Sequence, residues 1–287
     1  MNSVRRSRHQ QIAKRWMSVA VASVVLGSGS LPAQAISWRD FLFRGIQVIQ
    51  LSNVSPRQEV SLGEQIHSNL QQRGMRLNRD RRLNSYVDQI GQRLSNSVSR
   101  SNIPYRFFVV QDDAVNAYAT AGGFVYVTTG LMKLADNEAQ LASVMAHEVG
   151  HIEEKHLIKQ IRQATLAQGI AATALGTDRN VLANIGVELL VRRPQSREHE
   201  YDADRTGLEI LRRAGYATSE APRFMEKLLS GGRPPTFVST HPAVSDRIVE
   251  LRRQIAASPN TGCERTPIPA SCGVNNAEYQ ALVRNRI

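Results

Sequence analysis

The sequence has 287 residues, of which 41% are hydrophobic and 21% are charged, and its formal net charge is +11. These proportions are ordinary for a globular protein and exclude collagen-like, coiled-coil and wholly disordered chains. Basic residues are mixed with acidic ones and form no run interleaved with aromatic residues, so nucleic acid is not an expected partner.

The first 35 residues have the features of a secretory signal peptide. Five basic residues precede an apolar stretch over 18–31, and residues 33–35 read Ala-Gln-Ala, a small-x-small cleavage site. About 14 apolar residues are too few to span a bilayer comfortably. We therefore expect an exported, periplasmic or secreted chain that begins near Ile36, with a net charge of +6 once the five basic residues are removed. An uncleaved leader would instead tether the protein to a membrane, which leaves peripheral membrane association as an alternative.

Hydrophobic periodicity predicts an α+β fold that is predominantly helical, with a small sheet. The expected organisation is an N-terminal segment over 36–60, one domain over 61–257 and an irregular tail over 258–287. Apolar residues recur at helical spacing, and short β-branched or aromatic runs are typical of strands. In chain order we expect helices over 61–74 and 83–94, strands over 105–110 and 124–128, and helices over 136–156, 157–190 with a break near 176–178, 197–214, 219–229 and 244–256.

The only two cysteines, Cys263 and Cys272, lie in the predicted tail. In an oxidising compartment they would close a small disulfide loop, and two free thiols are the alternative. Their spacing matches no common zinc-binding pattern.

His147-Glu148-Val149-Gly150-His151 is the motif most indicative of chemistry. Four residues advance a helix by slightly more than one turn, so both imidazoles project from one face and can bind one zinc ion. Glu148 lies one residue along, where its carboxylate can reach a water beside the metal rather than the metal itself. A surface helix that happens to carry two histidines is the competing interpretation.

A hydrolytic zinc site needs a third protein ligand and an open fourth position. The metzincin pattern is excluded, because Glu153 and Leu157 occupy the positions of its glycine and histidine. His156 is one residue short of the required place, and we expect it to pack or hydrogen-bond on the same helix. Further along the chain, Glu200 and Asp204 are in i, i+4 register, so that one could bind the metal while the other orients a ligand histidine. These residues alone do not decide among Glu200, Asp204 and the neighbouring His199.

Together these features resemble the M48 family of zinc metallopeptidases. The resemblance covers about residues 61–252 and includes the 147–151 motif, Glu200-x-x-Ala203-Asp204, the segments 116–119 and 122–132, and His241-Pro242 followed by Arg247-Ile248. Ala121 departs from the family pattern, which usually has proline there. The resemblance implies a zincin-like fold in which the zinc-binding motif lies on the active-site helix.

The resemblance also implies roles for individual residues. It makes His147, His151 and Glu200 the ligands of one Zn²⁺ per chain, Glu148 the general base, and Asp204 the hydrogen-bond partner of His147. His241 would lie near the metal, either as an oxyanion stabiliser or as a fourth ligand that blocks water. Arg247 would donate to substrate or anchor its own loop. The further candidates for substrate binding are Asn116, Gly123, Phe124, Val125 and Tyr126.

The expected reaction is peptide-bond hydrolysis, with Glu148 as the base that activates water. If the 124–128 strand lies at a sheet edge, it would pair with an extended substrate backbone, so the expected partners are unfolded or extended polypeptides. Ordinary pairing inside the sheet is the alternative for this strand. The 157–190 region is expected to cover the cleft. Competing functions are a periplasmic holdase that uses the same cleft with little turnover, and a zinc hydrolase of a non-peptide bond.

Overall fold

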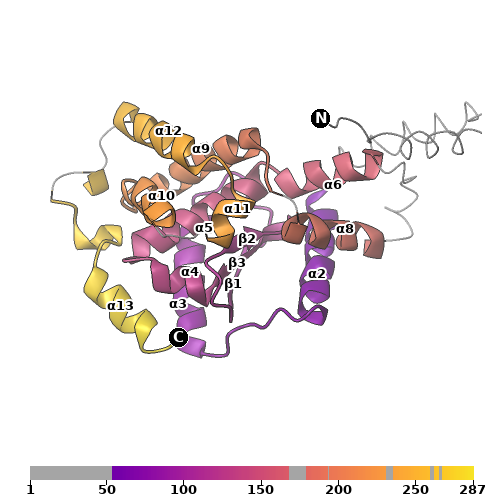
Figure 1. The fold of residues 1–287 in the computed structure, drawn as a ribbon, viewed down its shortest axis with the longest axis horizontal. Helices are drawn as coiled ribbons and strands as arrows, with labels where there is room; N and C mark the ends of the chain where they lie inside the picture. Colours follow the sequence, from indigo (N-terminus) through magenta and orange to yellow (C-terminus); the bar gives the residue numbers. More distant parts are fainter. Residues whose placement is uncertain (1–53, 168–178, 193, 231–234, 259–261, 265–266) are drawn as a thin grey trace, which may run out of the picture. The chain divides into compact units, whose positions relative to one another are not determined.

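The computed structural model describes residues 54–167, 179–192, 194–230, 235–258, 262–264 and 267–287. Within these ranges the chain is mainly helical with one small sheet, which confirms the predicted fold class (Figure 1). The expected signal peptide, and the part of the expected cover at 168–178, lie outside the described residues. No helix in the described part of the chain combines the length and the apolarity needed to cross a membrane.

The elements are α2 (Pro56–Gln72), α3 (Arg81–Ser95), β1 (Arg106–Val110), β2 (Ala117–Ala119), η1 (Ala121–Gly123), β3 (Phe124–Thr128), α4 (Thr129–Leu134), α5 (Glu138–Glu153), α6 (His156–Ala167), α8 (Arg179–Arg192), α9 (Arg197–Arg213), α10 (Glu220–Ser230), α11 (Thr236–Thr240), α12 (Val244–Ala257), η2 (Gly262–Glu264), η3 (Ala270–Cys272) and α13 (Asn276–Arg284).

The sheet has three strands in the order β1-β3-β2. β3 pairs in parallel with β1 and antiparallel with β2, in which Tyr118 lies opposite Tyr126. β3 is therefore the central strand, and both of its edges are already paired. The interpretation that the 124–128 strand lies at a sheet edge and pairs there with substrate, through Phe124, Val125 and Tyr126, is wrong, because this strand is buried and both of its edges are paired inside the sheet. Gly123 precedes the strand in η1, and its role in substrate binding stays a prediction.

α5 packs closely against α9, and two glycines permit this approach. A Cβ atom on Gly150 of α5 would lie 2.6 Å from the carbonyl oxygen of Ala203 on α9. A Cβ atom on Gly207 of α9 would lie 2.9 Å from the carbonyl oxygen of Ala146 on α5. Both distances are shorter than ordinary van der Waals contact, so any larger side chain would push the helices apart. The close crossing brings side chains of both helices to one place.

Side-chain caps set the starts of these helices. The Asn137 side chain accepts a hydrogen bond from the backbone N–H of Gln140 at the start of α5. Ser196 caps α9 in the same way. α2 begins at Pro56 rather than near residue 61, because Ser55 and Gln58 form a capping box that the apolar pattern does not reveal.

The prediction of one helix that continues to His156 is wrong, because α5 ends at Glu153. Lys155 adopts a left-handed conformation with φ of 55° and separates α5 from α6, which begins at His156. His156 therefore contacts His151 from the next helix and not from the same one. Neither glycine nor proline marks this break, so the helical pattern of the sequence continues across it.

Three α-helices in the described part of the chain were not predicted from the sequence: α4, α11 and α13. α4 follows β3 directly, and the Thr128 side chain caps it by accepting a hydrogen bond from the N–H of Leu131. α13 lies in the tail that was expected to be irregular. Tyr279 of α13 is buried and donates a hydrogen bond of 2.8 Å to the carbonyl oxygen of Met132 on α4, so this part of the tail is packed against the domain.

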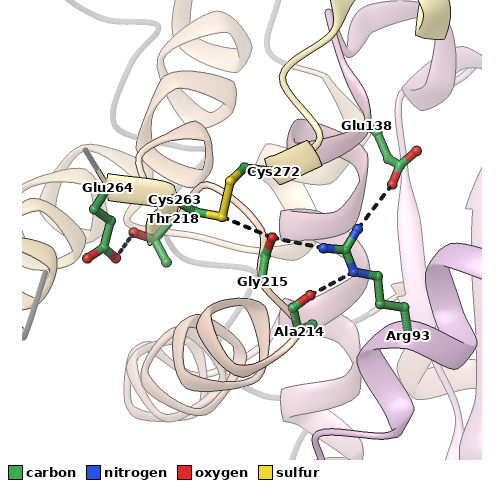
Figure 2. Close-up of a disulfide and its surroundings, with 8 residues drawn as sticks. All are labelled: Arg93, Glu138, Ala214, Gly215, Thr218, Cys263, Glu264 and Cys272. Atoms are coloured by element: carbon green, nitrogen blue, oxygen red, sulfur yellow. Dashed lines mark hydrogen bonds and ion pairs between the residues drawn. A yellow bond between two sulfur atoms is a disulfide. The ribbon is translucent and has the colours of Figure 1, made fainter. Parts of the chain in front are cut away.

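A disulfide joins Cys263 to Cys272 within the tail and lies beside Gly215, just after the end of α9 (Figure 2). The carbonyl oxygen of Gly273 accepts a hydrogen bond of 2.9 Å from the N–H of Ala139 in the first turn of α5. The carbonyl oxygen of Cys272 accepts one of 3.1 Å from Ala217, just after α9. The disulfide loop therefore satisfies backbone groups at the beginning of one helix and beyond the end of the other.

We expect replacement of both Cys263 and Cys272 by serine to lower the free energy of unfolding by roughly 2–3 kcal/mol, because the crosslink restricts the unfolded chain. Denaturant unfolding of the two proteins, each with and without a thiol reductant, measures this. The reductant should destabilise only the wild type. Equal stability of wild type and variant under oxidising conditions would show that the crosslink contributes nothing.

Candidate active site

Four side chains with metal-binding atoms meet between α5, α9 and α11. His147 and His151 come from α5, Glu200 from α9, and His241 from the residue that follows α11. One donor atom of each lies within 4.8 Å of the others, and all four residues are buried. The structure thus brings together the three residues predicted as ligands and adds His241 as a fourth donor.

The spacing of these atoms fits a single zinc ion. The Nε2 atoms of His147 and His151 are 3.1 Å apart, and Nε2 of His151 is 3.5 Å from Oε1 of Glu200. Nδ1 of His241 is 3.1 Å from the same oxygen. Donors bound tetrahedrally to zinc at roughly 2.0–2.1 Å lie about 3.3–3.4 Å from one another. Imidazole nitrogens combined with one carboxylate oxygen are also a donor set typical of zinc.

Asp204 and Arg247 contact the residues of this cluster without contributing donor atoms to it. Oδ1 of Asp204 lies 2.9 Å from Nδ1 of His147, so the expected contact between the two is present. Nε and Nη2 of Arg247 each donate to Asp204 at 2.7 Å, and Nη1 donates to Glu200. The prediction that Arg247 binds substrate is wrong, because this side chain is fully buried and bonded to two carboxylates. Its alternative role, that of an internal anchor, agrees with these contacts.

The charges around the two acids keep both ionised. Burial raises the pKa of Asp204, but the Arg247 guanidinium and the hydrogen bonds from Arg247 and His147 outweigh this and hold the pKa below its ordinary value. Burial also opposes ionisation of Glu200. The charge of His241 and the hydrogen bonds from the three histidines nevertheless hold the pKa of Glu200 well below its ordinary value. Both carboxylates are therefore anionic at neutral pH, the form in which one can bind a cation and the other can accept from His147.

Glu148 lies beside the cluster and outside it. Its side chain is buried, and Oε1 is 3.4 Å from Nε2 of His241. Oε1 makes no hydrogen bond to any residue that the structure describes. A buried oxygen without a partner costs about 1–3 kcal/mol, and it is free to accept a proton from a water beside the cluster.

The cluster opens into a cleft that runs past β2. Asn116, predicted to bind substrate, lies on the wall of this cleft, and its Oδ1 is buried without a hydrogen-bond partner among the described residues. The remaining lining residues come from the strand and from the ends of the surrounding helices: Glu59, Ala117, Tyr118, Ala119, Thr120, Ala121, Glu148, His151, Ile152, Lys155, Leu157, Ile158, Leu189, Leu190, Gln195, Thr240 and His241.

β2 is an edge strand with free backbone groups. Asn116 and Thr120 exchange hydrogen bonds with β3, through the N–H of Thr128 and the carbonyl of Phe124. Hydrogen-bonded and non-hydrogen-bonded pairs alternate in an antiparallel ladder. The N–H and C=O groups of 117 and 119 therefore point away from β3, on the side that can receive another strand.

The strand β2 on the wall of this cleft is not predicted by the sequence pattern. It has only three residues, fewer than the four to eight over which alternation can be detected. Tyr118 is its one residue with a strong strand preference. The resemblance had marked the same segment, 116–119, without assigning it a conformation.

Comparison with known proteins agrees with this site. Residues 81–255 match the family model described as Peptidase family M48. The Beta-barrel assembly-enhancing protease of Escherichia coli (strain K12) is 31% identical over 261 residues, which cover 85% of this chain and 53% of the relative. Metalloprotease LoiP of the same organism is 27% identical over 84% of this chain and 96% of its own length. Mitochondrial metalloendopeptidase OMA1 of Arabidopsis thaliana is 34% identical over 50% of this chain and 30% of its own. The chain thus spans about half the length of the first of these relatives.

Proposed function

The chain belongs to peptidase family M48, and from this premise we propose that it is a zinc-dependent endopeptidase acting on unfolded or misassembled proteins of the cell envelope. One observation carries the proposal: a buried cluster of His147, His151 and Glu200 lies beside Glu148 and opens onto a free strand edge. The names of the two Escherichia coli relatives, an assembly-enhancing protease and a metalloprotease, support a proteolytic role in protein quality control.

In the proposed mechanism His147, His151 and Glu200 hold the zinc ion. When bound, zinc supplies a Lewis acid that activates water and polarises the carbonyl of the scissile bond. The carboxylate of Glu148 takes up the proton of the attacking water and then delivers it to the leaving amine, so one side chain acts first as base and then as acid. Asp204 keeps His147 oriented, and Arg247 keeps Asp204 and Glu200 in place.

The substrate would bind along β2 rather than along β3. An extended segment placed antiparallel to β2 would exchange hydrogen bonds with the free N–H and C=O groups of Ala117 and Ala119. These groups require a backbone with its own hydrogen-bonding edge free. A folded domain offers few such edges, whereas an unfolded or misassembled chain offers many. This argument supports extended polypeptides as the substrate class.

His241 is best explained as a fourth donor in the resting protein. Its Nδ1 lies 3.1 Å from Oε1 of Glu200 and 3.3 Å from Nε2 of His147, so it would be able to complete the donor set of a zinc ion held by the other three residues. Structural zinc sites have four protein ligands, whereas catalytic sites keep one position open. His241 must therefore withdraw its Nδ1 before hydrolysis, and its Nε2 already faces Glu148 at 3.4 Å.

Removal of the metal is expected to stop cleavage. A strong zinc chelator, followed by dialysis, should abolish hydrolysis of a permanently unfolded protein, and one equivalent of zinc per chain should restore it. The native form of the same protein serves as the control substrate and should be cleaved far more slowly. Cleavage that persists after the measured zinc content has fallen to zero would refute a zinc-dependent mechanism. Zinc binding without cleavage of either substrate would favour a holdase that uses the same cleft.

A further inference from the structure

His156 is a buried histidine that the proposed mechanism does not use. It begins α6, directly after the break at Lys155, whose left-handed backbone turns the chain back toward α5. Its side chain has no solvent exposure, and its Nδ1 lies 2.8 Å from Nδ1 of His151. A ligand histidine of the cluster thus shares a short hydrogen bond with a second imidazole.

The direction of this hydrogen bond follows from the chemistry of imidazole. Nε2 of His151 faces the cluster, 3.1 Å from Nε2 of His147 and 3.5 Å from Glu200. A neutral imidazole that offers Nε2 to a metal carries its proton on Nδ1. His151 is therefore the donor in the contact with His156, and Nδ1 of His156 is the acceptor.

The ring of His156 is held in place by its neighbours. It stacks on the ring of His199 with centroids 4.1 Å apart and an interplanar angle of 17°. His199 belongs to α9 and immediately precedes Glu200. The His156 ring is thus confined between the helix that carries two of the four donors and the helix that carries the third.

We propose that His156 is a positioning residue for the metal site, which selects the Nδ1–H form of His151 and aims its Nε2 at the metal. This inference rests on the zinc site of the proposed function. It gives the two ligand histidines of α5 different partners: His147 is held by the carboxylate of Asp204, and His151 by a neutral acceptor. Such partners fix the tautomer and the orientation of a metal-binding imidazole.

A role in packing alone does not explain this side chain. Nε2 of His156 is buried and has no hydrogen-bond partner among the described residues. An apolar residue of similar size would fill the same space without leaving a polar atom unpaired. The imidazole provides one thing that an apolar residue cannot, namely the acceptor for His151.

Two substitutions of equal size separate these roles. Asparagine at 156 can place its Oδ1 near the position of the original Nδ1, whereas leucine has the same branched shape and no acceptor. We expect His156→Leu to weaken zinc binding by about 10–100-fold, the range found when such partners are removed, and His156→Asn to stay within a few-fold of wild type. Competition with a chromophoric chelator measures zinc affinity, and thermal unfolding of the zinc-free proteins measures the stability of the fold.

His67→Leu is the matched control. His67 is a half-buried histidine whose Nδ1 lies 2.8 Å from the hydroxyl of Tyr126, so it too shares a hydrogen bond with another side chain, but it lies outside the cluster. It should leave zinc affinity unchanged. If the leucine variant of 156 does not fold, His156→Phe, which keeps an aromatic ring against His199, provides the same test. Equal zinc affinity of the acceptor-free variant and wild type, or equal losses for Asn and Leu, would overturn the proposal. Failure of the wild type to bind zinc would instead overturn the proposed function.

Discussion

Glu148→Gln is expected to reduce cleavage of an unfolded protein by about 10²–10⁴-fold, the usual contribution of a general base, while the zinc content stays unchanged. The carboxylate lies beside the donor cluster without belonging to it, and its Oε1 has no hydrogen-bond partner among the described residues. Glutamine has the same shape and can still accept a hydrogen bond, but it cannot take up a proton. The change therefore removes proton transfer and leaves the metal ligands in place.

The measurement is the rate of peptide-bond cleavage at equal, directly determined zinc content. Glu198→Gln, at an exposed position in the first turn of α9, is the matched control and should cleave like the wild type. Undiminished cleavage by Glu148→Gln would exclude Glu148 as the base. A variant that no longer cleaves, yet still prevents aggregation of an unfolded protein and replaces the wild type in cells, would favour the holdase.

The metal site was predictable to the extent that it depends on local spacing. His147 and His151 lie one helical turn apart, and this relation survives in any helix that contains both. The position of Glu200 beside the two histidines depends instead on how α9 packs against α5. It requires the two helices to approach closely, with Gly150 against Ala203 and Gly207 against Ala146, and no local pattern specifies that crossing. For this reason the residues alone left Glu200, Asp204 and His199 undecided, and the family resemblance was needed to choose.

The wrong predictions for the 124–128 strand and for Arg247 both concern contacts between distant parts of the chain. The composition of 124–128 predicts a strand, but whether a strand is central or at an edge depends on its partners, and the three-residue β2 was too short to be recognised. The resemblance left two roles open for Arg247, donation to substrate or anchoring of its own loop, and arginine is rarely buried without a charged partner. Its partners Asp204 and Glu200 lie on another helix, more than forty residues away. Pairing of this kind is set by tertiary structure.

Arg247→Met is expected to destabilise the zinc-free protein by about 3–5 kcal/mol, the usual effect of removing one partner of a buried ion pair. Methionine fills a similar volume but leaves Asp204 and Glu200 without their cation. Arg253→Met on the same helix is the matched control, because Arg253 is exposed and its ion pair among the described residues is with Glu250. Its loss should destabilise the protein far less, because solvent screens an exposed ion pair. Denaturant unfolding of both variants measures the difference.

The destabilisation by Arg247→Met should also depend on pH and on Asp204. Since the native pKa of Asp204 is lowered, its ionic contribution is present above the ordinary carboxyl pKa and is lost as the pH falls through the native value. The difference between wild type and variant should therefore shrink on acidification. Adding Asp204→Asn to Arg247→Met removes one of the two carboxylates that Arg247→Met leaves without a cation. The double variant should therefore be more stable than the sum of the two single destabilisations predicts. Strictly additive losses would mean that Arg247 stabilises the fold by packing, and that its charge does not hold the ligand Glu200 and its neighbour in place.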